Sequence, residues 1–309
     1  MHPLRVDPAV AHAVQAGRPV VALESALITH GFHWPDNLEI ARRMEAAVRD
    51  RGALPATVAV LHGEPRIGIT GEELAYLASA PGPGTGDNRA PPRKISLRDL
   101  PLATAQRASG GTTVAATMHL AHLAGIQVFA TGGIGGVHRH HPEDISADLT
   151  ALESIPITVV CSGAKAILDL PRTRENLETR GIPVVGYDTD SFPAFYSRRS
   201  GLGVDAVVST AESVALMAQA RTALGLSQAL LVCVPVPREH ELPAEEAAAF
   251  IARALDEARA AGVRGNDLTP YLLARVVELS DGRAQRANEA LLVNNARIAA
   301  HIARAVSHV

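Results

Sequence analysis

The side chains with the most distinctive chemistry in this 309-residue sequence are its two lysines, Lys94 and Lys165. Every other member of its 29 Lys and Arg residues is arginine. Arginine replaces lysine on a solvated surface, but its guanidinium cannot lose a proton and become a nucleophile. A lysine that takes part in chemistry is therefore one that arginine cannot replace, and both lysines are candidates for a functional role.

Lys165 follows an apolar run and Ser162-Gly-Ala, at the start of what the sequence predicts as a short apolar helix. Apolar neighbours lower the pKa of a lysine, and the helix dipole is unfavourable to a positive charge at a helix N-terminus. A neutral amine at this position is a nucleophile. The alternative is a structural lysine, whose stem lies along the helix start while its ammonium reaches solvent.

Glu24 is a carboxylate at the end of an apolar run predicted to be a buried strand. The carboxyl edge of such strands is where α/β enzymes assemble their sites. Desolvation there raises the pKa of a carboxyl and suits it to general acid catalysis. A strand-end glutamate can equally cap a backbone turn, and the sequence leaves both interpretations open.

The stretch 109–115, Ser-Gly-Gly-Thr-Thr-Val-Ala, is a turn predicted to open a helix. Backbone N–H groups at a helix start, with the hydroxyls of Thr112 and Thr113, form a cradle for an anion such as phosphate. The alternative is an ordinary helix N-cap made by either threonine.

A glycine-dense segment, Gly132-Gly-Ile-Gly-Gly136, follows another predicted strand. It is not a dinucleotide-binding fingerprint, because the last glycine of that pattern would fall where His138 stands. The segment suits a phosphate or a closely approaching substrate, or else a flexible connection. His138, His140 and His141 lack the spacing of a transition-metal site and favour a solvated loop.

Asp144 and Asp148 lie four residues apart, with Ser146 between them, in a predicted helix start. Residues at this spacing share a helix face. Two carboxylates and a hydroxyl there suit a hard cation such as Mg²⁺ or Mn²⁺, with water completing the shell. The alternative is an N-capping Asp144 and a surface Asp148.

The elements that must position these residues alternate between short apolar runs and amphipathic helices, which predicts a single α/β/α domain over residues 1–309 with a mostly parallel central sheet and a helical C-terminal region. The Pro/Gly-rich segment 81–92 is predicted to be an exposed insertion. The predicted strands are Pro19–Leu23, Thr57–Leu61, Gln127–Ala130, Ile157–Cys161, Pro183–Tyr187, Ala206–Ser209 and Ala229–Pro235. The predicted helices are Asp36–Gly52, Thr70–Ala80, Thr113–Ala124, Pro243–Gly262, Thr269–Ser280 and Ala284–Val306.

Composition excludes several classes of protein. A formal net charge of −3 argues against a general nucleic-acid binder. A hydrophobic content of 47% with 20% charged residues is typical of a globular chain. No apolar run is long enough to span a bilayer, and the first residues lack a signal-peptide core, so a cytoplasmic location is expected. The two cysteines, Cys161 and Cys233, are predicted to be buried thiols.

Taken together, these segments resemble the pseudouridine-5′-phosphate glycosidase family, which includes indigoidine synthase A-like proteins. The resemblance covers residues 19–305. Its matching stretches are Ala22–Ser25 with Thr29–Gly31, Lys94–Leu100, Gly111–Ala115, Phe129–Arg139, Asp144–Leu149, Val160–Lys165, Phe192–Phe195, Thr269–Arg275 and Val293–Ala296.

The resemblance implies reversible cleavage of pseudouridine 5′-phosphate to uracil and ribose 5-phosphate by a homotrimer that uses Mn²⁺ or a similar divalent ion and no organic cofactor. Lys165 is implied as the nucleophile, Glu24 as the proton donor and Asp144 as the metal anchor. The implied substrate contacts are Lys94, Val114, Ser146, Ala147 and Asp148, with Asn288 contacting uracil. Thr112, Thr113, Thr131 and His138 are further expected substrate contacts, and the phosphate is expected near the Thr112–Thr113 turn, His138 and Lys94.

The chemistry of the substrate explains the need for a lysine. Pseudouridine joins sugar to base through a carbon–carbon bond, so the base carbon has no lone pair that an acid can protonate, as it would in an ordinary glycosidase. A lysine amine can instead attack C1′ of the ribose, open the ring and form an imine that accepts electrons.

Two other functions remain open at this point. A Schiff-base lyase or aldolase acting on another sugar phosphate would share the lysine but not the uracil pocket. A non-catalytic ligand-binding relative would need none of Glu24, Asp144 and Lys165.

Overall fold

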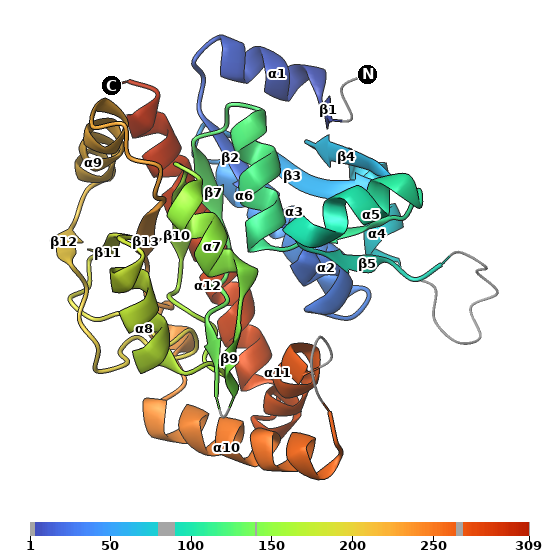
Figure 1. Cartoon of the computed structure of the whole chain (residues 1–309), viewed down its shortest axis with the longest axis vertical. Helices are drawn as coiled ribbons and strands as arrows, with labels where there is room; N and C mark the ends of the chain where they lie inside the picture. Colours follow the sequence, from blue (N-terminus) through green and yellow to red (C-terminus); the bar gives the residue numbers. More distant parts are fainter. Residues whose placement is uncertain (1–3, 80–89, 140, 264–267, 309) are drawn as a thin grey trace.

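Eleven strands form the central sheet in the part of the chain that the computed structural model describes, residues 4–79, 90–139, 141–263 and 268–308 (Figure 1). Most of them are short apolar runs buried on both faces, as expected for a sheet covered by helices on two sides. The strands of this sheet are β1 (Arg5–Val6), β2 (Val20–Leu23), β3 (Leu54–Leu61), β4 (Glu64–Ile67), β5 (Arg93–Ile95), β6 (Gly110–Thr112), β7 (Val128–Ala130), β10 (Thr158–Cys161), β11 (Val184–Tyr187), β12 (Ala206–Val208) and β13 (Leu230–Cys233).

The strand order is β1-β4-β3-β2-β7-β10-β13-β11-β12, with β6 also paired to β3 and β5 paired to β6. All pairs from β3 through β2 to β12 are parallel, whereas β4 and β6 pair with β3 in the antiparallel sense. The prediction of a mostly parallel sheet is therefore confirmed. Two further strands, β8 (Val137–His138) and β9 (His141–Ile145), form a small antiparallel pair of their own.

Helices cover both faces of the sheet. Figure 1 shows α6 (Val114–Leu123) and α7 (Ala147–Ser154) in front of it, and α3 (Asp36–Arg49) and α12 (Arg283–Val306) behind it. The other helices are α1 (Pro8–Gln15), α2 (Ala26–His30), α4 (Gly71–Ala78), α5 (Leu100–Ala105), α8 (Leu170–Thr179), α9 (Ala211–Ala223), α10 (Ala244–Ala260) and α11 (Leu268–Leu279).

Helix α12 is the element that ties the end of the sequence to the centre of the sheet. It packs on β2, β7 and β10 and beside α3 and α9. Its buried face consists mostly of alanines with Leu291 and Leu292, so its backbone can approach the strands closely. One polar residue, Asn295, is fully buried in this face. Its amide Nδ2 donates to the carbonyl of Thr131, at 2.9 Å, and to Ser162 Oγ, at 3.1 Å, which fixes two segments that leave the sheet.

All seven predicted strands and the six helices predicted with both ends are present, with ends that differ by a few residues, whereas the short helix predicted at Lys165 is absent. The strands that the sequence did not predict include β5 and β6. Neither strand has an apolar pattern. In β6, Gly110 and Gly111 must be small because the backbone passes close to other segments there. A Cβ at Gly110 would lie 2.1 Å from the carbonyl oxygen of Arg93, and one at Gly111 would lie 2.4 Å from that of Ser25.

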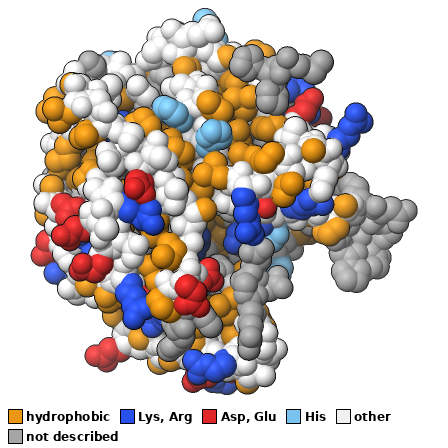
Figure 2. All heavy atoms as spheres, in the orientation of Figure 1, with side chains coloured by type: hydrophobic (Ala, Val, Ile, Leu, Met, Phe, Trp, Pro, Cys, Tyr) orange, Lys and Arg blue, Asp and Glu red, His pale blue; other side chains and the backbone are white. Residues whose placement is uncertain are grey.

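Most of the predicted insertion, residues 81–92, lies outside the described residues. The prediction of one domain over residues 1–309 stays a prediction, which the continuity of the sheet from β1 to β13 supports. Cys161 and Cys233 are buried, free thiols, as predicted. Within the described ranges, no helix has the length and apolar character needed to cross a membrane. On the face seen in Figure 2, acidic and basic side chains are intermixed.

Candidate active site

Four of the residues singled out in the sequence meet at one small cavity of about 70 Å³: Glu24, Lys94, Lys165 and Asn288. Glu24 directly follows β2, and Lys165 follows β10 by a few residues. Both strands flank β7, so their carboxyl ends lie at the same edge of the parallel sheet. Asn288 comes from α12, and Lys94 from β5. The cavity therefore brings together residues that are far apart in the sequence, with Glu24 and Asn288 separated by 264 positions.

The Glu24 carboxyl is held in a buried environment with several charges around it. Burial raises its pKa, and the negative charge of Asp148 raises it further. The positive charge of Lys165 is the strongest opposing influence, followed by a hydrogen bond donated by the Thr131 hydroxyl and by the charge of Lys94. Burial is the largest of these causes, so the net effect favours the protonated acid. This confirms the predicted elevation of the Glu24 pKa.

Lys165 does not start a helix, which corrects the sequence prediction. The segment from Ser162 to Asp169 is irregular, and α8 begins only at Leu170, behind an Asp169 N-cap. The backbone of Lys165 instead joins the glycine-rich segment, because its N–H donates to the carbonyl of Ile134 at 3.1 Å. The argument from a helix dipole therefore does not apply. Lys165 is positioned by the end of β10 and by this backbone hydrogen bond.

The structure lowers the pKa of Lys94. Burial within the surrounding protein is the largest cause, and the positive charge of Lys165 adds to it, against the opposing charges of Asp148 and Glu24. The residue lines the cavity but is exposed in β5, so solvent weakens these effects.

Other cavity residues were not chosen from the sequence as site residues: His30, Phe32, Phe195, Thr269, Leu273 and Leu292. Four of them, His30, Phe195, Thr269 and Leu273, lie within the stretches that carry the family resemblance, which is a signal that was available. His30 Nδ1 lies 2.7 Å from Thr29 Oγ1, and burial together with the charge of Lys94 lowers the pKa of its imidazole. Phe195 has a positive φ of 62° and lies against Gly133, a conformation that no local pattern announces.

The glycine-rich segment is packed tightly rather than flexible. A Cβ at Gly135 would lie 2.2 Å from Ser146 Oγ, and one at Gly136 would lie 2.4 Å from Thr173 Oγ1. Gly132 and Gly133 line the cavity itself. The absence of side chains here thus lets three other segments reach the edge of the site.

Asp148 is the anion that occupies the start of α6. Its Oδ1 accepts a hydrogen bond from the N–H of Ala115, at 3.0 Å, and its Oδ2 accepts one from the N–H of Gly135, at 2.8 Å. The side chain is buried. Part of the cradle predicted for a phosphate is therefore filled by a carboxylate of the chain, which joins α6 to the glycine-rich segment.

Replacing Asp148 with asparagine is expected to destabilise the fold. Asparagine offers one acceptor oxygen, so its NH₂ group would face one of the two backbone donors. A buried donor left unpaired costs about 1–3 kcal/mol. Chemical denaturation measures this directly. Asp144→Asn is the matched control, because the Asp144 side chain is exposed and its loss should change stability by no more than about 0.5 kcal/mol. Equal stabilities of the two variants would contradict the assigned role of Asp148.

The residues of the turn that leads into α6 differ in their hydrogen bonding. Thr112 is fully buried, and its hydroxyl donates to the carbonyl of Val58 at 2.8 Å and lies 2.9 Å from Thr117 Oγ1. Thr113 is the N-cap of α6, yet its buried hydroxyl has no hydrogen-bond partner among the described residues. Val114 is buried in the first turn of α6.

The remaining predicted residues lie beside the cavity rather than in it. Ser146 is the N-cap of α7, and its Oγ accepts from the N–H of Asp148 at 3.2 Å. Ala147 follows it, with its side chain exposed. His138 is half-buried in β8. Thr131 is fully buried and contacts the site through its hydrogen bond to Glu24.

Asp144 and Asp148 do not share a helix face, which corrects the second helix prediction. Asp144 lies in β9 with its side chain exposed, because Ile145 of that strand pairs with Val137 of β8 and delays α7 until Ala147. Both carboxylate oxygens of Asp148 accept hydrogen bonds from backbone N–H groups. Among the described residues, no group of three or more His, Cys, Asp or Glu side chains could hold a metal ion.

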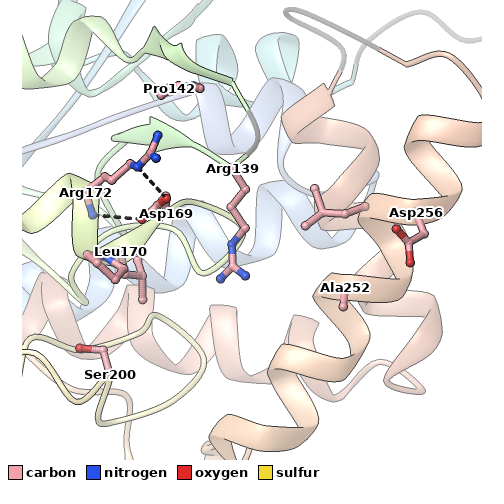
Figure 3. A pocket seen from close by; sticks show the side chains of 10 residues that line it. Arg139, Pro142, Asp169, Leu170, Arg172, Ser200, Ala252 and Asp256 are labelled. Carbon is pink, nitrogen blue, oxygen red and sulfur yellow. Dashed lines mark hydrogen bonds and ion pairs between the residues drawn. The ribbon is translucent and has the colours of Figure 1, made fainter.

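A second, larger cavity of about 760 Å³ lies between α8 and α10 (Figure 3). Arg139 points into it, with Asp169 and Arg172 on one wall and Asp256 on the other (Figure 3). The Arg139 guanidinium donates to the carbonyls of Leu168, at 2.9 Å, and Ala166, at 3.2 Å. None of the predicted site residues lines this cavity. Its size alone therefore does not make it the reactive centre.

The fold and the smaller cavity define an α/β protein equipped with an acidic carboxyl and two amines at one sheet edge. Two solved structures share this fold. One is the prealnumycin C-glycosynthase AlnA in complex with ribulose 5-phosphate, with a TM-score of 0.89 and 37% identity over 100% of this chain and 98% of that one. The other is an indigoidine synthase A-like protein from Thermotoga maritima, with a TM-score of 0.88 and 33% identity over 99% and 98%.

Residues 9–305 match the family described as Indigoidine synthase A like protein, and the chain belongs to that family. Its curated relatives include the pseudouridine-5′-phosphate glycosidase of Solibacter usitatus, which is 50% identical over 305 residues, covering 98% of this chain and 99% of the relative. The protein of the same name from Methylobacterium nodulans is 53% identical over 308 residues, covering 99% and 89%.

Proposed function

We propose that the chain is a pseudouridine-5′-phosphate glycosidase, which reversibly cleaves the carbon–carbon glycosidic bond of its substrate to give uracil and ribose 5-phosphate. The observation that carries the proposal is the meeting of Glu24 and Lys165 at one cavity, with the pKa of the carboxyl raised. Full-length relatives at about half identity carry that name. A structural neighbour binds a pentose phosphate, ribulose 5-phosphate.

The residues of the cavity can carry the reaction in four steps. The Lys165 amine, in its deprotonated form, attacks C1′, and the bond from C1′ to the ring oxygen breaks; a proton passes from nitrogen to that oxygen, which leaves an open ribose joined to Lys165 as a secondary amine. Glu24 then gives its proton to the base carbon C5. The electron pair of the C1′–C5 bond goes to the base, which departs as uracil, while the nitrogen lone pair forms the C1′ imine. Water adds to the remaining imine carbon, and ribose 5-phosphate is released with regeneration of the Lys165 amine.

Release of uracil from pseudouridine 5′-phosphate is the direct test of this function. The purified protein with Mn²⁺ is expected to liberate free uracil and ribose 5-phosphate in equal amounts, measured by chromatography. A Schiff-base aldolase acting on another sugar phosphate would release no base from this substrate. Absence of uracil over prolonged incubation, in a sample shown to be folded, would overturn the proposal.

The divalent ion belongs to the proposal as well, with Asp144 as its anchor. Both oxygens of Asp148 already accept backbone hydrogen bonds, whereas the Asp144 side chain is exposed. An ion there would be held by Asp144 and mostly by water, as Mg²⁺ and similar ions often are. Equilibrium dialysis with Mn²⁺, comparing the parent protein with Asp144→Asn, tests the assignment.

The proposed homotrimer rests on the family resemblance, and multi-angle light scattering of the purified protein would test it. Large apolar side chains are exposed over the described residues, among them Leu123, Val207, Leu216 and Leu224. The cytoplasmic location stays a prediction from the sequence.

Lys94 is proposed to bind the substrate phosphate through its positive charge, which gives a prediction for pH dependence. Because its pKa is lowered, Lys94 loses its charge at a lower pH than an ordinary lysine. A lost charge-assisted hydrogen bond costs about 1.5–3 kcal/mol, so KM should rise about tenfold or more on the alkaline side. In Lys94→Arg the charge persists, and KM should stay flat there. Identical KM profiles for the two proteins would contradict this role.

A further inference from the structure

We propose that the chain has a second ligand site, which binds a small oxyanion such as phosphate between β10 and α9, at the edge of the sheet opposite the candidate active site. A cavity of about 150 Å³ lies there, lined by residues that include Thr158 of β10 and Arg221 of α9. Thr158 begins β10, whereas Lys165 follows the other end of the same strand. The two sites are thus separated by the length of the strand, roughly 10 Å at 3.3 Å per residue.

The first observation is a cation with unsatisfied donors. Among the described residues, the buried Nε and Nη1 atoms of Arg221 have no hydrogen-bond partner. Burial is the cause that lowers the pKa of this guanidinium. A buried charge without a partner is costly, so proteins pair such groups with a counter-ion. Arg221 therefore points to a ligand of negative charge.

The second observation is independent and comes from the strand. The Thr158 side chain is only 1% exposed, and its hydroxyl has no hydrogen-bond partner in the part of the chain that the structure describes. The backbone N–H of Thr158 is already paired with the carbonyl of Gln127, at 2.9 Å, so only the hydroxyl is left to bind. Buried hydroxyls are rarely left unsatisfied. A hydroxyl donor and guanidinium donors that line one cavity suit a ligand rich in acceptor oxygens.

The chemistry of these donors defines the class of ligand. Guanidinium N–H groups form their strongest hydrogen bonds with phosphate and carboxylate oxygens. The cavity holds a few atoms rather than a nucleotide, since pockets for drug-sized ligands measure about 300–1,000 Å³. Arg221 is only half-buried, so an ion can enter from solvent. A free oxyanion of phosphate size meets all of these conditions.

The test measures inorganic phosphate binding by calorimetry and by the shift in the thermal unfolding midpoint, with chloride at equal ionic strength as the reference. Phosphate is expected to raise the midpoint of the parent protein. Arg221→Met should weaken phosphate binding about tenfold or more. Thr158→Val, which removes one hydroxyl at nearly constant shape, should weaken it about fivefold. Arg259→Met is the matched control, because it removes the same charge from an exposed position and should bind phosphate like the parent.

Activity on pseudouridine 5′-phosphate separates this site from the candidate active site. Arg221→Met should keep the parent kcat and KM, so any phosphate binding lost in that variant belongs to the second site. Without phosphate, Arg221→Met should also unfold at a higher temperature than the parent, since it no longer buries an unpaired charge. Phosphate binding by Arg221→Met at the parent affinity would overturn the proposal, and so would unchanged binding by Thr158→Val.

Discussion

Lys165→Arg is expected to lower kcat by at least about 10⁴-fold, a loss typical of removing a catalytic nucleophile. The guanidinium keeps the positive charge and most of the length of the side chain, but it cannot become a free amine and form an imine. The cavity should remain intact, because Lys165 is held by its backbone bond to Ile134 rather than by its side chain. Steady-state and single-turnover uracil release measure the loss.

Borohydride reduction during turnover supplies the positive evidence for the same step. It should attach a ribose phosphate to Lys165, and mass spectrometry of peptides locates the adduct. Lys94→Arg is the control, since it alters the other amine of the cavity while keeping its charge, and it should retain both turnover and the adduct on Lys165. An adduct on Lys94, or a Lys165→Arg protein with undiminished kcat, would refute the assignment of the nucleophile.

Glu24→Gln is the second substitution with a large expected effect. A positioned general acid contributes about 10²–10⁴-fold to rate, and glutamine cannot supply the proton. The parent enzyme needs the protonated carboxyl, so its kcat should fall as pH rises through the raised pKa of Glu24. Thr131→Val removes a hydrogen bond that lowers this pKa, so the fall in kcat should move to higher pH. A pH profile that does not move in Thr131→Val would argue against Glu24 as the acid.

Glu24→Gln is also expected to increase the stability of the folded protein. The folded state binds the Glu24 proton more tightly than the unfolded chain does, so this group contributes a stability that is lost as pH rises from the ordinary carboxyl pKa through the raised one. At a pH above the raised pKa, Glu24→Gln removes the burial of a charge, and the free energy of unfolding should rise. Lower stability of Glu24→Gln than of the parent throughout the alkaline range would show that the charges of Lys165 and Lys94 outweigh burial.

The sequence was most informative where local pattern and tertiary environment agree. Six of the seven predicted apolar strands are buried on both faces, so their composition alone predicts them; the exception is β12 at the end of the sheet, where Val207 is exposed. Glu24 and Lys165 could be placed at one edge because parallel strands end together. The resemblance added Lys94 and Asn288, which no local pattern connects to that edge.

The features that could not be predicted have a common physical cause, because each depends on contacts between residues that are distant in the sequence. Asp144 was predicted in a helix, but pairing of β9 with β8 keeps it extended. The lowered pKa of Lys94 could not be predicted, because it depends first on burial in the folded chain and then on Lys165, which lies 71 positions further along. Thr158 and Arg221 leave no signal, since an unpaired donor is visible only once its surroundings are known.

The docking of α12 also has a consequence for how the site comes into being. Asn288 and Leu292 of this helix form part of the wall of the cavity that Glu24 also lines, and Asn295 fixes the segments after β7 and β10. Contacts between such distant positions form slowly, because a long stretch of chain must be closed into a loop before they are made. Synthesis runs from the N-terminus, so a nascent chain would carry both Glu24 and Lys165 before the wall that encloses them exists. Catalytic competence is therefore acquired late, when the helix over residues 283–306 closes the site.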